Sequence, residues 1–124
     1  MEASLYPLMR QLEDEHWWYL ARREILQTLL HTLHLPPGAQ VLEVGCGTGG
    51  NICMLSQFGT VTCVERDPQA ARLAVQRRLT PVVPGELPHG LPQFPTAFDL
   101  ITAFDVIEHV EEDLASLLTL SAML

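Results

Sequence analysis

The ten residues from Val41 to Gly50, VLEVGCGTGG, constrain the fold more than any other part of the sequence. A short apolar run ends at Val44, and glycine follows at positions 45, 47, 49 and 50. Glycine accepts positive φ angles and lets the backbone turn sharply and approach a ligand without interference from a Cβ atom. The segment therefore predicts a strand, a tight turn that cradles a nucleotide-like cofactor, and the start of a helix.

The spacing of these glycines also fits a dinucleotide. Gly45, Gly47 and Gly50 satisfy the G-x-G-x-x-G fingerprint. Glu65 ends the next apolar run, about 20 residues further on, where that fingerprint wants an acid. A dinucleotide brings a pyrophosphate to the turn, however, and Glu43 lies just before it. A carboxylate at that position would repel a phosphate.

The charge around the predicted turn favours a cationic ligand. No Lys or Arg occurs between Gln40 and Glu65, whereas further acids, Glu86, Asp105 and Glu108, surround the expected pocket. S-adenosylmethionine carries both an ammonium group and a sulfonium centre, so it suits such a site. The charge pattern therefore favours this cofactor over a nicotinamide dinucleotide.

Helical and strand-like patterns alternate along the chain. Apolar residues recur at near-helical spacing from Leu8 to Leu35, which predicts one long helix or two short ones before the Pro36–Gly38 segment. The other expected elements are strands over 41–44, 61–65, 82–83 and 98–104, helices over 50–58, 68–78 and 111–124, and an irregular segment over 84–95. Asp67 as N-cap and Pro68 at the first helical position predict one of these helix starts.

This alternation predicts an α/β fold with a Rossmann-like parallel sheet. Strands joined through helices form right-handed parallel units, and the helices cover both faces of the sheet. We expect the strand order three, two, one, four. Ligands of such sheets bind at the carboxyl ends of the strands where the order reverses, here between strands one and four.

The composition is that of one globular domain. The chain has 124 residues, a net charge of −8 and 48% hydrophobic residues. All seven basic residues are Arg, spread singly or in pairs, so the phosphate-neutralising patch that nucleic acid requires is missing. The first residues do not resemble a signal peptide, and no apolar run is long enough to span a membrane. We expect neither nucleic acid nor a membrane as partner.

The three cysteines, Cys46, Cys53 and Cys63, form no C-x-x-C pair and fall in elements expected to be buried. This pattern favours reduced thiols over a disulfide framework or a zinc site, so we expect no metal. Reduced thiols are typical of the cytoplasm, which is the expected compartment.

Three segments, in this order and spacing, resemble the class I S-adenosylmethionine-dependent methyltransferases: VLEVGCGTGG, VTCVERDP and FDLITAFDVIEHV. The resemblance covers about Gln40 to Val110. The upstream HWWY and RRE segments, residues 16–19 and 22–24, resemble more weakly the leader helix of small-molecule methyltransferases. The resemblance implies an N-terminal helical leader over 1–37 and a partial S-adenosylmethionine-binding Rossmann-like domain over 38–124. It also implies S-adenosylmethionine as cofactor and a small molecule as acceptor.

The turn and the resemblance together imply a cofactor site. Its expected residues are Glu43, Gly45, Cys46, Gly47, Gly49, Glu65, Arg66, Glu86, Leu87, Phe104 and Asp105. We expect Glu65 to bind the ribose hydroxyls rather than to be a solvated acid at a strand end. Phe104 and Asp105 either wall the pocket, with the Phe104 carbonyl facing the cofactor, or are a core aromatic and a strand-ending acid.

Other charged residues keep two interpretations. Glu43 either satisfies amides of the turn or orients the methionine ammonium group, and the two roles are compatible. Glu86 either meets the adenine amino group, as the resemblance implies, or is a solvated loop charge. Arg22 or Arg23 either pairs with the methionine carboxylate or forms an exposed helix salt bridge to Glu15 or Glu24.

Two further features are open. His109 and Glu108 form either an acid/base pair or a cap for the following segment. Trp17 and Trp18 are adjacent and cannot face one core from a helix, so either one packs while the other covers the pocket, or one is core and the other surface. No catalytic residue follows from the sequence, because methyl transfer depends largely on positioning.

The sequence departs from the family in its number of strands. A complete class I domain carries seven, whereas four are expected here, so we expect a fold cut short after the fourth strand. The outer side of residues 98–104 would then be an open sheet edge, which favours aggregation, a homodimer through that edge, or a fragment of a longer chain. The leading hypothesis is an S-adenosylmethionine-dependent methyltransferase or its cofactor-binding part. The alternatives are a non-catalytic cofactor-binding or dimerising module of the same fold and, third, a dehydrogenase.

Overall fold

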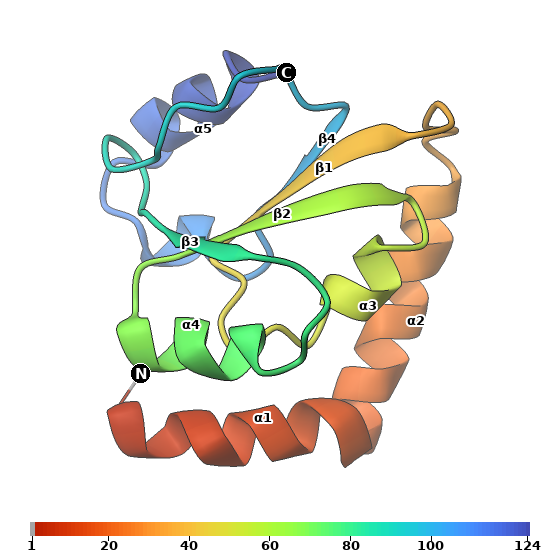
Figure 1. Cartoon of the computed structure of the whole chain (residues 1–124), viewed down its shortest axis with the longest axis vertical. Helices are drawn as coiled ribbons and strands as arrows, with labels where there is room; N and C mark the ends of the chain where they lie inside the picture. The colour runs from red at the N-terminus through yellow and green to blue at the C-terminus, as the bar shows by residue number, and fades with distance from the viewer. Residues whose placement is uncertain (1) are drawn as a thin grey trace.

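A four-stranded parallel sheet forms the centre of the computed structural model, which describes residues 2–124 (Figure 1). Its strands are β1 (Ala39–Val44), β2 (Gly59–Glu65), β3 (Val82–Pro84) and β4 (Leu100–Thr102). Their order across the sheet is β3-β2-β1-β4, and every neighbouring pair is parallel. The predicted α/β Rossmann-like fold and its strand order are confirmed.

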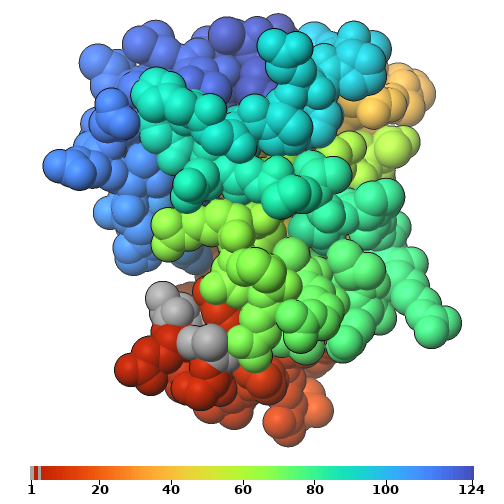
Figure 2. Space-filling view, turned by 60° about the vertical axis from the view of Figure 1, so that its left-hand side comes forward, coloured from red at the N-terminus to blue at the C-terminus, as the bar shows by residue number. Residues whose placement is uncertain are grey.

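Helices cover both faces of this sheet (Figure 1). The first face carries α2 (Trp17–His31), α3 (Ile52–Leu55) and α4 (Pro68–Val75), and the second carries α5 (Asp113–Ser121). Helix α1 (Tyr6–Glu15) packs against α2 and α4. Figure 2 shows the same stacking, with the blue C-terminal segment at one end and the red α1 beside the green α4 at the other. The predicted helical leader is thus two helices, and both pack on the domain.

Strand β1 lies at the centre of two apolar clusters, one on each face. Val41 packs in the cluster under α2, α3 and α4, whereas Leu42 and Val44 pack in the cluster under α5. Successive side chains of a strand point to opposite faces, so Glu43 shares the face of Val41. This places a carboxyl group inside an otherwise apolar layer, directly before the glycine turn.

Local chemistry explains where two helices begin. The side chain of Asp67 accepts hydrogen bonds from the backbone N–H groups of Gln69 at 2.9 Å and Ala70 at 3.0 Å, and Pro68 occupies the first turn of α4. His16 is extended, with ψ of 133°, and its Nδ1 accepts from the N–H of Trp18 at 3.2 Å. The Asp67 cap is confirmed, and His16 is the break between α1 and α2.

Four predicted elements, over 50–58, 68–78, 98–104 and 111–124, are longer than the observed α3, α4, β4 and α5. Helix α4 ends early because the following turn brings Arg78 to a φ of +57°, which no α-helix accommodates. The amide of Phe98 donates to the carbonyl of Met123 at 2.9 Å, so it bonds to the segment that follows α5 and not to the sheet. Tertiary contacts therefore shorten elements that the local pattern would extend.

The three cysteines are free thiols, but their surroundings differ. Cys46 and Cys63 are buried, as expected, whereas Cys53 is exposed and the prediction of burial is wrong for it. Residue 53 falls on the outer side of the short α3, which packs on the core through Ile52, Met54 and Leu55.

No helix within residues 2–124 combines the length and apolar character that a bilayer span requires.

Candidate functional site

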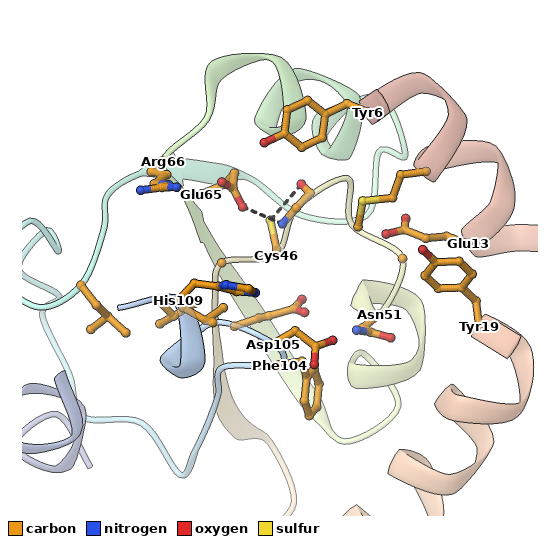
Figure 3. A pocket seen from close by; sticks show the side chains of 18 of the residues that line it. Tyr6, Glu13, Tyr19, Cys46, Asn51, Glu65, Arg66, Phe104, Asp105 and His109 are labelled. Carbon is orange, nitrogen blue, oxygen red and sulfur yellow. Dashed lines mark hydrogen bonds between the residues drawn. The ribbon is translucent and has the colours of Figure 1, made fainter. Parts of the chain in front are cut away.

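A cavity of about 500 Å³ opens at the carboxyl ends of the strands, next to α1 and α2 (Figure 3). Its volume is in the range of sites that hold a small ligand. Ten of the predicted cofactor-site residues line it: Glu43, Gly45, Cys46, Gly47, Glu65, Arg66, Glu86, Leu87, Phe104 and Asp105. The structure therefore brings together residues from the ends of all four strands, as the predicted topology requires.

Gly49 is the predicted residue that the cavity lining does not include. Its φ is +85°, and a Cβ atom there would meet Ile52 Cδ1 at 2.9 Å and Ala74 Cβ at 3.1 Å. Gly49 thus allows the turn to pack against α3 and α4. Gly47, with a φ of +58°, faces the cavity, and the nearest atom to an added Cβ is Met9 Cε at 3.5 Å. Backbone conformation, not lack of space, requires glycine at this second position.

The Glu65 carboxylate ties two loops together. Its Oε2 accepts from the amide of Gly47 at 2.7 Å (Figure 3). Its Oε1 accepts from the amide of Asp67 at 3.0 Å. The residue is only 8% exposed, so the interpretation as a solvated acid at a strand end is wrong. Each carboxylate oxygen can accept a second hydrogen bond, so a ligand hydroxyl remains compatible with these contacts.

Glu43 is buried at the bottom of the cavity, with 2% of its surface exposed. Burial raises its pKa to about 8, and the neighbouring charges of Glu13 and Glu65 act in the same direction. Hydrogen bonds with Asn51 and Cys63 oppose this shift, and the Cys63 thiol lies 3.9 Å from Glu43 Oε2. The Gly47 amide donates its hydrogen bond to Glu65, so this amide of the turn is satisfied by Glu65 and not by Glu43.

Ion pairs bridge the rim of the cavity. Arg22 on α2 pairs with Asp105, which follows β4, and its guanidinium lies 5.5 Å from the centroid of the Trp18 ring. Arg22 therefore pairs with Asp105 and not with Glu15 or Glu24. Across the opening, Arg66 Nη1 lies 3.7 Å from Glu86 Oε2, and both side chains are exposed. The rim thus joins α2 to the segment after β4, and β2 to the segment after β3.

The two tryptophans and His109 lie at the outer part of the site. Trp18 lines the cavity and is 46% exposed, while Trp17 is 71% exposed and faces away from the core. Neither tryptophan is a core residue. His109 also lines the cavity, and its Nε2 lies 3.9 Å from Glu108 Oε1. It belongs to a short 3₁₀ turn, Ile107–His109, and it does not cap the helix that follows.

Several lining residues had no signal in the sequence. Tyr6 and Glu13 reach the cavity from α1, and Asn51 reaches it from the start of α3 (Figure 3). Met9 of α1 lines the cavity as well. Burial, together with the negative charges of Asp67 and Glu65, raises the pKa of Tyr6. Only the docking of α1 over the glycine turn brings its residues here, and helical periodicity carries no information about that docking.

Residues 15–124 match the family model described as a methyltransferase domain. The mitochondrial ubiquinone biosynthesis O-methyltransferase of Schizosaccharomyces pombe is 38% identical over 82 residues, which cover 60% of this chain and 30% of that protein. The chain therefore spans less than a third of the length of this curated relative.

Solved methyltransferase structures are similar to the chain, and two of them illustrate the likeness. An amino pentose methyltransferase from Micromonospora echinaspora, involved in calicheamicin biosynthesis and solved with SAM bound, gives a TM-score of 0.73 at 22% identity, covering 90% of this chain and 48% of that one. A TehB-like SAM-dependent methyltransferase from Corynebacterium glutamicum gives a TM-score of 0.68 at 28% identity, covering 95% and 68%. The likeness extends over nearly the whole of this chain.

Proposed function

The chain belongs to the methyltransferase domain family, and on that premise we propose that it forms the S-adenosylmethionine-binding part of an enzyme that methylates a small molecule. The observation that carries the proposal is the cavity at the carboxyl ends of the strands, where Glu65 holds the glycine turn through a 2.7 Å hydrogen bond. Open parallel sheets bind their ligands at this position.

The lining of the cavity suits a cationic cofactor. Its acidic residues are Glu13, Glu43, Glu65, Glu86 and Asp105, and its basic residues are Arg22, Arg23, Arg66 and His109. Arg22 and Arg66 are each paired with an acid at the rim, whereas Glu43 lies at the bottom with hydrogen bonds to Asn51 and Cys63. Bound there, S-adenosylmethionine supplies an electrophilic methyl group on a sulfonium sulfur. The SAM-bound neighbour from Micromonospora echinaspora supports the choice of cofactor.

Within this proposal three acids contact three parts of the cofactor. Glu65 accepts hydrogen bonds from the ribose hydroxyls, using the lone pairs that its backbone contacts leave free. Glu43 orients the methionine ammonium group, since it is the acid buried below the turn. Glu86 meets the adenine amino group from the segment after β3. Cys46, Leu87 and the Phe104 carbonyl complete the walls.

The acceptor is proposed to enter between α2 and the segment after β4. Trp18, Tyr19, Asp105 and His109 line this part of the cavity. These groups can hold an acceptor in line with the methyl group and exclude water, which supplies much of the rate in such a reaction. Two related proteins are by name an O-methyltransferase of ubiquinone biosynthesis and an amino pentose methyltransferase, which supports a small molecule as the acceptor class.

Catalysis by these 124 residues is itself part of the proposal, because the chain spans less than half of the pentose methyltransferase. The alternative is a cofactor-binding or dimerising module without activity. We also propose the cytoplasm as compartment on the ground of the free thiols, although the fission-yeast relative is mitochondrial by name.

Calorimetric titration with S-adenosylhomocysteine, and with NAD as the competing ligand, tests the proposal. We expect micromolar binding of S-adenosylhomocysteine and none of NAD. The matched control is Gly47→Val, which changes the turn at a position that faces the cavity. Binding of NAD alone, or failure of a folded protein to bind S-adenosylhomocysteine, would contradict the proposed cofactor. Methyl transfer from labelled S-adenosylmethionine then separates an enzyme from a binding module.

A further inference from the structure

A buried carboxylate joins α1 to the glycine turn. Glu13 is the buried residue of α1, with 5% of its surface exposed. Its Oε2 accepts from the Thr48 hydroxyl at 2.7 Å and from Arg77 Nη2 at 2.9 Å. Thr48 is itself fully buried within the turn. The contact therefore links a residue of the N-terminal helix to the interior of the loop that shapes the cavity.

Two arginines extend this link to both sides of the turn. Arg77, which follows α4, donates through Nε to the Thr48 carbonyl at 2.8 Å. Arg23 on α2 donates through Nη1 to the Gly50 carbonyl at 3.1 Å and through Nη2 to the Glu13 carbonyl. Residues 48–50 are thus held from α1, from α2 and from the end of α4. We call Glu13, Thr48, Arg77 and Arg23 the loop clamp.

The packing at Gly50 shows how closely the clamp fits. A Cβ atom at Gly50 would lie 2.6 Å from both Cδ and Oε2 of Glu13. The carboxylate therefore rests directly on the backbone of the turn, and it also lines the cavity. A side chain at position 50 would have to displace the Glu13 carboxylate, which occupies that space.

Stability alone does not explain a charge at this place. Burial raises the pKa of Glu13 even though Arg77 and Arg23 act in the opposite direction. Asp14 shares Arg77, accepting from Nη1 at 2.9 Å, so the arginine serves two carboxylates. A buried ion pair is often no more stabilising than apolar residues of similar volume. The charged groups instead fix the conformation of the turn, because each hydrogen bond holds a particular atom of residues 48–50.

We propose that Glu13 is a positioning residue of the cofactor site, which holds residues 48–50 of the glycine turn through the loop clamp. The consequence for binding rests on the proposed function, whereas the ordering of the turn does not. Helix α1 then contributes directly to the site. The Glu13 carboxylate keeps the hydrogen bond between Gly47 and Glu65 in place before any ligand binds.

The test compares Glu13→Gln with Glu15→Gln. The two substitutions make the same chemical change on the same helix, but Glu15 is exposed and outside the clamp. Hydrogen exchange of the amides in residues 46–50 of the ligand-free protein is the first measurement. We expect exchange about tenfold faster in Glu13→Gln, the factor that corresponds to the loss of one charge-assisted hydrogen bond. Glu15→Gln should exchange as the wild type does.

Affinity for S-adenosylhomocysteine is the second measurement. We expect about a tenfold loss in Glu13→Gln and no loss in the control Glu15→Gln. Thr48→Val removes the hydroxyl donor while keeping the shape of the side chain, so it serves if Glu13→Gln does not fold. Since both changes act on the same contact between Thr48 and Glu13, the double variant should be no worse than the more affected single variant.

Unchanged exchange in residues 46–50, or an equal increase throughout the sheet and α1, would overturn the proposal, because either result assigns Glu13 to general stability. A wild-type protein that does not bind S-adenosylhomocysteine would instead contradict the proposed function. The exchange experiment would then still decide whether Glu13 orders the turn.

Discussion

The substitution Glu43→Gln should make the folded protein more stable at alkaline pH. Glu43 is buried between its register partners Cys63 on β2 and Thr102 on β4. Burial raises the pKa of its carboxyl from 4.5 to about 8 in the folded protein. An acid with a raised pKa binds more protons in the folded state than in the unfolded state. Its favourable contribution is therefore complete below pH 4.5 and is lost as the pH rises towards 8.

The size of this loss follows from the two pKa values. Each pH unit between them corresponds to about 1.4 kcal/mol of unfolding free energy. The loss is on the order of 3 kcal/mol at pH 7 and on the order of 5 kcal/mol above pH 8. Domains of this size have a total stability of about 5–15 kcal/mol, so the effect is large enough to measure. Glutamine keeps the size of the side chain but does not ionise.

Urea unfolding between about pH 5 and pH 9 measures the effect in the ligand-free protein. The wild type should lose stability relative to Glu43→Gln as the pH rises, and the difference should level off above pH 8. Glu24→Gln is the control, because Glu24 is an exposed acid on α2. Its pH profile should parallel that of the wild type. Subtracting the Glu43→Gln profile from that of the wild type removes the contribution of Asp14, whose pKa is lowered. The charge of Glu13 raises the pKa of Glu43, so this interaction is part of the measured difference.

A constant difference between the wild type and Glu43→Gln across this range would refute the reasoning. It would mean that Glu43 ionises as easily in the folded chain as in the unfolded one. Water or a counter-ion would then have to reach the bottom of the cavity, and the carboxyl would be charged before the cofactor arrives.

Three further outcomes are expected. Glu65→Ala should weaken S-adenosylhomocysteine binding by about tenfold or more in calorimetry, because it removes the proposed ribose contact and the Gly47 tether; unchanged affinity would take Glu65 out of the site. Gly47→Val should abolish binding while circular dichroism shows the helices largely formed, since the strain at a φ of +58° is local; retained binding would mean that the turn is not the cradle. Asp67→Ala should lower the free energy of unfolding by about 1 kcal/mol in urea, as expected for a lost helix N-cap, whereas an unchanged midpoint would contradict the role of its two hydrogen bonds.

The parts of the fold that the sequence predicts well are those that local chemistry determines. The apolar run before Gly45 and the Asp67-Pro68 pair each specify their own conformation, and the alternation of strands and helices leaves few possible orders for the sheet. Elements that end through distant contacts are predicted too long. Phe98 lies outside the observed strand because its amide donates a hydrogen bond to the carbonyl of Met123, which follows the C-terminal end of α5.

The candidate site also contains residues that could be predicted from the sequence and residues whose position depends on distant contacts. Residues at the ends of β1, β2 and β4 could be assigned to a shared pocket, because parallel strands bring their carboxyl ends to one edge. Gly49 could not be separated from its neighbours, since only the packing of Ile52 and Ala74 behind it shows that it faces the interior. Spacing identifies the glycine turn but not which side of the turn each glycine occupies.

The run Glu13-Asp14-Glu15 shows most clearly what a sequence pattern leaves open. Three consecutive acids on a helix are typical of a solvated face, and Glu15 fits that description. Glu13 is instead buried on a loop 35 residues away, and its ion pair with Arg77 spans 64 residues. The predicted division at residues 37 and 38 stays a prediction, but these contacts cross it. Glu13 lies before this division, whereas Thr48 and Arg77 lie after it. Residues from both parts therefore line the same cavity.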